Sequence, residues 1–191
     1  MKKKISMILF VLILGSILTF VLIGVNYYTK PIIEKNEAIK IKSRVMDAFG
    51  ISYNIDDIEK VFSENVKIET ENNVKYYFTE NNEISFEITG NGLWGPITGI
   101  LALKPDLETI KGITLIHQEE TPGLGGRIAE KEYLSSFKDK KIIPKLEIVS
   151  PGKAIKENEV DGITGATMTS KAFEELINNQ AQKYISNLKR N

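Results

Sequence analysis

An uncharged run of 21 residues, from Ile5 to Val25, constrains this chain more than any other feature. As a helix it would be about 31 Å long, which matches the hydrocarbon core of a bilayer. Three lysines at positions 2–4 precede it, and the positive-inside rule places such a terminus in the cytoplasm. We therefore predict a single-pass anchor over residues 1–26 in the cytoplasmic (inner) membrane, in contact with lipid, with the rest of the chain on the extracytoplasmic side.

A cleaved signal peptide is the alternative for this segment. It would have a shorter apolar core and a cleavage site of the small-x-small type. The sequence after Val25 begins Asn-Tyr-Tyr-Thr-Lys-Pro and contains no such site. Its two tyrosines suit a membrane interface. These features favour a retained anchor.

Residues 27–60 are predicted to form a helical connector, and residues 61–191 a folded domain. Pro31 suits the first turn of a second helix, because proline lacks the amide that the first turn leaves unpaired anyway. A loose apolar stripe follows, and Gly50 is a suitable helix end. We predict no functional residue in the connector.

From Val61 to Thr89 the apolar residues recur with period two, which is typical of half-buried strands. Strands are predicted at 66–70, 75–79, 84–88, 97–103, 110–116 and 145–149, with Asn72-Asn73 and Asn81-Asn82 as turns. Residues 129–138 read as a short helix, and a long amphipathic pattern follows Ser170. The predicted fold class is α+β: a twisted, mainly antiparallel sheet with packed helices.

Composition excludes several classes of site. The chain has 25 basic and 25 acidic residues, and this balance gives no reason to expect nucleic-acid binding. It has no cysteine and one histidine, which excludes thiolate and disulfide chemistry and makes a metal site unexpected. Any redox chemistry would need an organic cofactor.

The stretch Asp161-Gly-Ile-Thr-Gly-Ala-Thr167 lies just before the C-terminal helix pattern. Thr169 or Ser170 would be a suitable N-cap, and the amides of a helix N-terminus favour an anion such as phosphate. The plain alternative is a turn followed by a helix cap, since Gly, Thr and Ser favour such places in any protein. From these residues alone, no modification of Thr167 follows.

Two glycine-rich loops provide further candidates. The first, residues 90–97, surrounds Leu93 and the single tryptophan, Trp94. That side chain is either a partly buried anchor or the wall of a site for a flat aromatic cofactor. The second, residues 117–128, combines the polar Glu120 and Thr121 with Leu124 between tight turns. This mixture suits a flavin, which has an apolar face and a polar edge.

Other titratable side chains carry no catalytic prediction. His117 is expected to be structural, because no nucleophile or second ligand accompanies it. Glu119 and Glu120 are adjacent in the sequence, so in a strand they would point to opposite faces rather than act as a pair. Lys153 is equally consistent with a flavin contact and with a solvated surface position. No catalytic residue is predicted.

The stretch ending at Thr167 resembles the flavinylation motif Asp-x-x-(Ser/Thr)-Gly-Ala-Thr of the FMN-binding domain family. That family includes the C subunit of the Na⁺-translocating NADH:quinone oxidoreductase (Nqr) and the G subunit of the Rnf electron transport complex. The Gly-Leu-Trp and Glu-Thr-Pro-Gly-Leu-Gly loops resemble the family's other signatures, in the same order. The resemblance implies FMN bound through a phosphoester to Thr167, made by a flavin transferase with FAD as donor and Mg²⁺.

The resemblance also implies which residues surround the cofactor. They are Thr167 as the covalent attachment point, with Leu93, Trp94, Glu120, Thr121, Leu124, Asp161, Thr164, Gly165 and Ala166. Asp161 and Thr164 would serve recognition by the transferase or positioning, rather than redox chemistry.

The function implied is an electron relay in an ion-translocating membrane redox complex, beside other subunits. The loops resemble those of Nqr, whereas the length is closer to the Rnf protein, so both complexes stay open. Two alternatives remain: a standalone membrane-anchored flavoprotein, and an anchored binding domain without redox activity. Flavin absorbance would distinguish the binding domain without redox activity from the two flavoprotein hypotheses. Copurifying membrane proteins would distinguish the relay subunit from the standalone flavoprotein.

Overall fold

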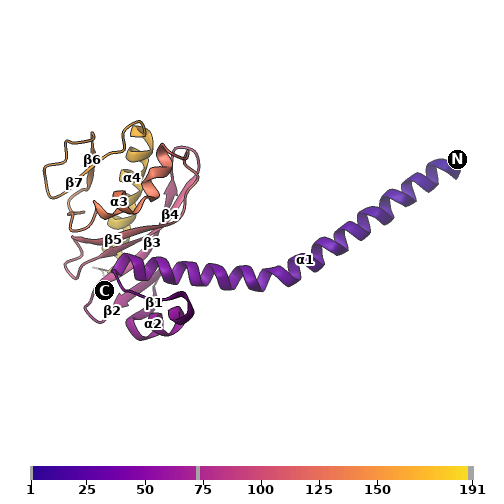
Figure 1. Cartoon of the computed structure of the whole chain (residues 1–191), viewed down its shortest axis with the longest axis horizontal. Helices are drawn as coiled ribbons and strands as arrows, with labels where there is room; N and C mark the ends of the chain where they lie inside the picture. Colours follow the sequence, from indigo (N-terminus) through magenta and orange to yellow (C-terminus); the bar gives the residue numbers. More distant parts are fainter. Residues whose placement is uncertain (1, 72–73, 189–191) are drawn as a thin grey trace. The chain divides into compact units, whose positions relative to one another are not determined.

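The structure is a computed structural model that describes residues 2–71 and 74–188. The chain divides into two compact units, one ending at Ile39 and one beginning at Lys40. The first unit consists of helix only, and the second contains the sheet and the remaining helices (Figure 1). The expected turn at Asn72-Asn73 lies outside the described residues.

Helix α1, Lys2–Phe49, is continuous and contains Pro31. The separate second helix predicted to begin at Pro31 is therefore wrong. Proline removes one helical hydrogen bond, but here the helix continues on both sides of it, because extending an existing helix is far easier than nucleating a new one. The helix is long and apolar enough to cross a membrane, with its apolar window near the N-terminus. It ends where predicted, at Gly50, whose φ is 76°.

Five antiparallel strands form an up-and-down sheet in the order β1-β2-β3-β4-β5. The predicted fold class is confirmed, and each of these strands starts and ends within three residues of its predicted limits. After α1 come a short 3-10 helix, η1 (Ile55–Asp57), and α2 (Ile58–Asn65). The strands are β1 (Val66–Glu71), β2 (Val74–Thr79), β3 (Ile84–Asn91), β4 (Pro96–Leu103) and β5 (Ile110–His117).

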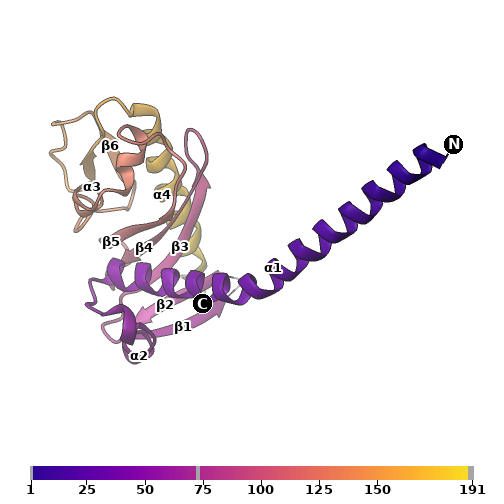
Figure 2. The same cartoon turned by 45° about the vertical axis from the view of Figure 1, so that its right-hand side comes forward.

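One face of the sheet carries the main core. Its middle row, read across β2 to β5, is Tyr76, Phe86, Leu101 and Ile113. Helix α4, Thr167–Leu188, packs its apolar stripe on this row. Figures 1 and 2 show α4 running along the sheet on this side. Burial of these side chains provides the main stabilisation of the domain.

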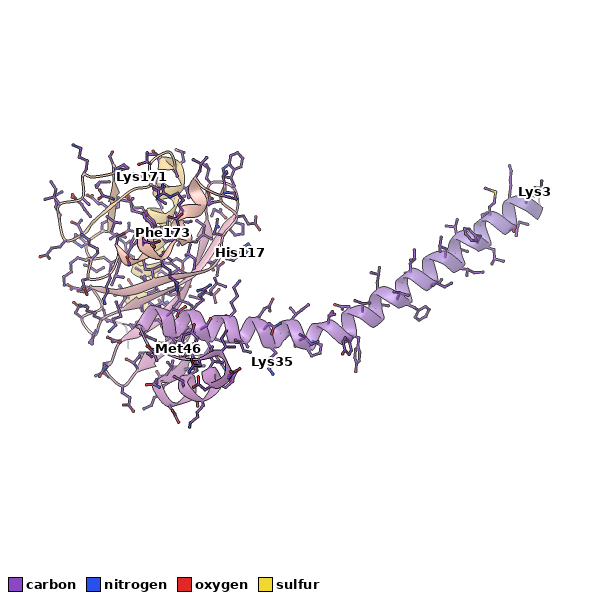
Figure 3. The ribbon with its side chains drawn as sticks, in the orientation of Figure 1. Lys3, Lys35, Met46, His117, Lys171 and Phe173 are labelled. Atoms are coloured by element: carbon purple, nitrogen blue, oxygen red, sulfur yellow. The ribbon has the colours of Figure 1, made fainter. Side chains whose placement is uncertain are left out.

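The opposite face is covered by the end of α1 and by α2. Its middle row is Tyr77, Ser85, Ala102 and Gly112. A Cβ at Gly112 would lie 2.4 Å from the carbonyl oxygen of Ala48, so glycine permits α1 to approach β5 this closely. Phe62 of α2 packs edge-on against Tyr77. Met46 and Phe173, labelled in Figure 3, are both fully buried, and they belong to the helices of the two outer layers.

The segment between β5 and α4 differs most from the sequence prediction. It contains η2 (Gly125–Ala129), α3 (Lys131–Ser135), and a small parallel pair, β6 (Glu147–Val149) with β7 (Glu159–Asp161). The helix expected over 129–138 is thus only five residues long, and the last predicted strand is shorter than expected. The sequence does not predict β7, because three residues are too few to show a period.

Candidate functional site

The loop between β3 and β4 presents two apolar side chains to solvent. Its turn is closed by the amide of Gly92, which donates to the carbonyl oxygen of Gly95 at 2.8 Å. Leu93 and Trp94, at the tip, are 46% and 72% exposed. A large apolar pair this exposed is unusual in a soluble domain unless something binds it.

The loop after β5 is folded around one backbone carbonyl. The oxygen of Thr121 accepts hydrogen bonds from the amides of Leu124 and Gly126, at 3.1 and 2.9 Å. Gly123 in between has a φ of 74°, which glycine adopts without strain. This turn leaves the side chain of Leu124 about half exposed, beside the tip of the first loop.

The third segment is the turn that leads into α4. The amide of Ala166 donates to the carbonyl oxygen of Ile163 at 3.0 Å, and Gly165 has a φ of 80°. A positive φ at the third position of a turn is typical of a type II turn and explains the glycine. The helix starts at Thr167, which is exposed. Its hydroxyl therefore stands at the first helical residue, where backbone amides remain unpaired by the helix.

The prediction that Thr169 or Ser170 caps α4 is wrong, because both lie inside the helix and are buried. The Ser170 hydroxyl accepts a hydrogen bond from the amide of Ile163 at 3.2 Å. The Thr169 hydroxyl donates to a carboxylate from the second loop. Both hydroxyls thus fix loops to the helix instead of ending it.

That carboxylate, Glu120, joins all three segments. Its Oε1 accepts from the amides of Leu93 and Trp94, at 2.7 and 3.1 Å, and its Oε2 accepts from the Thr169 hydroxyl at 2.7 Å. Glu120 is only 3% exposed. A Cβ at Gly125 would lie 2.5 Å from the Thr169 hydroxyl oxygen, so glycine is needed where these groups meet.

The three segments enclose a pocket of about 280 Å³. This volume is close to the lower limit for ligand sites, ~300 Å³. Of the predicted residues, the pocket is lined by Leu93, Trp94, Glu120, Thr121, Leu124, Gly165, Ala166 and Thr167. Gly125 of the second glycine-rich loop also lines it, together with Met168 and Thr169, which sequence reasoning did not assign to the pocket. Met168 is 64% exposed and adds to the apolar rim.

Two predicted residues, Asp161 and Thr164, lie outside the lining of this pocket. Asp161 Oδ1 accepts from the amides of Lys153 and Ala154, at 2.9 and 3.0 Å. The hydrogen bond from Ala154, together with that from Lys153, holds the pKa of Asp161 below its usual range. Asp161 thus fixes the loop before the motif. Thr164 is exposed in the type II turn.

The remaining polar candidates lie around this region. His117 is exposed at the end of β5, where Figure 3 labels it, and its Nε2 lies 3.1 Å from Glu119 Oε1. Lys153 is exposed and lines a separate hollow together with Lys145 and Lys171. Within residues 2–71 and 74–188, no group of three or more His, Asp or Glu side chains is placed to hold a metal ion.

Comparison with known proteins identifies this type of domain. Residues 92–182 match the FMN-binding domain family. The chain is 40% identical over 106 residues to the C subunit of the Na⁺-translocating NADH-quinone reductase of Haemophilus ducreyi, covering 53% of this chain and 41% of that one. It is 32% identical over 171 residues to the same protein of Neisseria meningitidis serogroup B, covering 74% and 66%.

Solved structures agree with this result. The crystal structure of the same type of protein from Parabacteroides distasonis has a TM-score of 0.70 and 25% identity, covering 80% of this chain and 94% of that one. The Shewanella oneidensis protein, NqrC, shares the fold at a TM-score of 0.69 and 19% identity, covering 78% and 96%. The matched segments span less than two thirds of the curated relatives' own lengths. Over residues 92–182 the chain therefore contains a domain of the FMN-binding family.

Proposed function

We propose that this chain carries FMN attached through a phosphoester to Thr167, with the flavin ring in the pocket formed by the three loops. The observation that carries the proposal is that Thr167 lines the same pocket as Leu93, Trp94 and Leu124. The mass of the intact chain tests it. Chain made with an active flavin transferase should be heavier by one FMN less one water.

The residues present fit such a group. Leu93, Trp94, Leu124 and Met168 give apolar surface for a flat ring, and all four are substantially exposed. The first turn of α4 gives unpaired amides and a helix dipole that favour a phosphate at Thr167. A pocket of about 280 Å³ accommodates a ring better than a whole dinucleotide.

Attachment requires a phosphoryl transfer that the domain does not perform alone. A threonine hydroxyl is a poor nucleophile without a base, and no such base is expected in this motif. We propose that a flavin transferase with bound Mg²⁺ uses FAD as donor. The bond from Thr167 Oγ1 to the FMN phosphorus forms, the bond from that phosphorus to the AMP oxygen breaks, and the hydroxyl proton passes to a base of the transferase.

The proposed role is an electron-relay subunit of a membrane redox complex. FMN supplies reversible one-electron chemistry when bound, and the protein residues orient its ring and limit its exposure to water. The similar relatives are subunits of NADH-quinone reductases, which favours an Nqr-type complex over an Rnf-type one. A standalone flavoprotein would instead purify without other membrane proteins.

We further propose that residues 1–26 anchor the chain, that 27–60 connect, with their part from Lys40 onward packed on the folded unit, and that 61–191 form the FMN-binding domain outside the cytoplasm. The chain lacks cysteine, so one introduced by Lys67→Cys on the exposed side of β1 reports sidedness. A membrane-impermeant maleimide should label it in cells whose outer surface is opened. Labelling only after lysis would place the domain in the cytoplasm.

The fluorescence of Trp94 should report the flavin. Trp94 is the single tryptophan and is 72% exposed on the pocket rim, so its emission comes from one known place. We expect strong quenching in the flavinylated chain and bright emission in chain made without the transferase. The Thr167→Ala chain made with the transferase should match the bright sample. Equal emission from flavinylated and unmodified chain would show that the ring does not lie beside Trp94.

A further inference from the structure

Strand β5 is the last strand of the five-stranded sheet, and among the described residues no strand is paired with part of its outer edge. The segment 139–142 covers only its start: the amide of Ile110 donates to the carbonyl oxygen of Lys140, and the amide of Asp139 donates back to the carbonyl oxygen of Ile110. Beyond this point, residues 112–115 keep regular pairing with β4, between two irregularities in the register. An edge strand presents backbone donors and acceptors that another strand can use.

A groove of about 510 Å³ runs along these same residues. One wall is the end of α1, from Arg44 to Gly50, and the other is α3 with the turn after it, up to Lys138. The floor includes the apolar side chains of Leu115 and Leu134. Both walls and the strand belong to the unit that begins at Lys40, so the groove is part of the folded domain.

Basic residues outnumber acidic ones on the lining of the groove. Its lining holds four basic residues, Arg44, Lys111, Lys131 and Lys138, but only one acidic residue, Asp47. Lys111 is paired with Glu83 at 2.6 Å, and Arg44 has a long contact of 3.4 Å to Asp47. Lys131 and Lys138 are exposed, and neither has an ion-pair partner among the described residues. The groove therefore attracts a negative occupant.

From this geometry we infer that the β5 groove binds an extended, acidic segment of a partner protein, which adds a strand beside residues 112–115. The strand edge supplies hydrogen bonds, the apolar floor accepts alternate side chains, and Lys131 and Lys138 pair with carboxylates. The inference concerns a surface other than the flavin pocket and does not require flavin.

Two other occupants fit less well. A second copy that paired its own β5 edge with this one would bring the same unpaired lysines against each other, and like charges disfavour that contact. An acyl chain would satisfy the apolar floor, but it would leave the backbone groups of the β5 edge without partners in a drier environment. An extended acidic peptide satisfies the edge, the floor and the charge together.

Photo-crosslinking in the host membrane tests the inference with the full chain. A photoreactive phenylalanine analogue replaces Ser135, an exposed residue of the groove wall. Crosslinks should map to one other protein, within one short segment of net negative charge. The K131E/K138E double variant should lower their yield at least about ten-fold, because it reverses both unpaired charges. The K67E/K75E variant, with the same charge change on exposed residues of β1 and β2, should not.

A synthetic copy of the crosslinked segment then tests the binding mode. Added to the full chain in detergent, it should slow amide hydrogen exchange within residues 112–115, and a copy with its carboxylates replaced by amides should bind at least about ten-fold more weakly. Crosslinks only to a second copy, to lipid or to a neutral or basic segment would overturn the inference, and so would their absence. Repeating the crosslinking with the Thr167→Ala chain, which has no attachment point for the flavin, tests the groove independently of the flavin proposal.

Discussion

Replacement of Thr167 by alanine is expected to abolish covalent flavin completely while leaving the domain folded. The phosphoester needs a side-chain oxygen, and alanine has none. Thr167 is exposed at the first residue of α4, so its methyl and hydroxyl groups contribute little to the core. We expect the free energy of unfolding to change by less than about 0.5 kcal/mol. Intact mass and in-gel fluorescence after denaturation measure the attachment.

Thr164→Ser is the matched control for this experiment. Thr164 lies three residues earlier in the same motif and is also exposed, and serine is the alternative that the motif allows at this position. It should still acquire one flavin, and the flavin-bearing peptide should carry the modification on Thr167. Covalent flavin on the Thr167→Ala chain, or none on wild-type chain made with an active transferase, would contradict the proposed attachment.

The carboxylate of Asp161, at the start of the same motif, has a structural role of its own. It holds the loop at Lys153 and Ala154 through two backbone hydrogen bonds, and it lies outside the lining of the flavin pocket. Its place in the motif therefore has a structural reason within the chain, because it fixes the loop that precedes the motif. Any contact with the transferase would come in addition to this role.

The sheet is predictable because its strands are six to eight residues long and rich in β-branched, aromatic and other apolar residues, and in β3 the residues Ile84, Phe86 and Ile88 alternate with polar ones. The short pair β6 and β7 is not, since three residues carry no usable period. Pro31 shows a different difficulty: its local preference favours a helix start, but an established helix absorbs one missing hydrogen bond. Local rules fail where the surrounding helix decides the outcome.

The family resemblance is enough to predict most of the residues that line the pocket. It does not predict which interactions hold these residues in place. The resemblance makes Glu120 a cofactor contact, but both its oxygens accept hydrogen bonds from the protein. Its partner Thr169 follows 49 residues later and lies where the sequence favours a helix cap. A pairing over that distance leaves no local pattern, so only the folded structure reveals that Glu120 holds the loops together.

Glu120→Ala is therefore expected to lower the free energy of unfolding by about 2–4 kcal/mol. The change removes the acceptor of the buried Thr169 hydroxyl and of the partly buried amides of Leu93 and Trp94. Once the first loop is no longer fixed, the absorbance bands of the attached flavin should shift as well. Chemical unfolding and the visible spectrum measure the two effects.

Two variants identify the cause as the lost hydrogen bonds rather than the lost charge. In Glu120→Gln the amide oxygen can still accept from Leu93 and Trp94, and the amide nitrogen can donate to the Thr169 oxygen, so the loss should be about 1 kcal/mol or less. Glu119→Ala removes a neighbouring carboxylate that is exposed, and should cost less than about 0.5 kcal/mol. If Glu120→Ala is as stable as Glu119→Ala, packing alone holds the three segments together. The conclusion that the hydrogen bonds of Glu120 connect them would then be wrong.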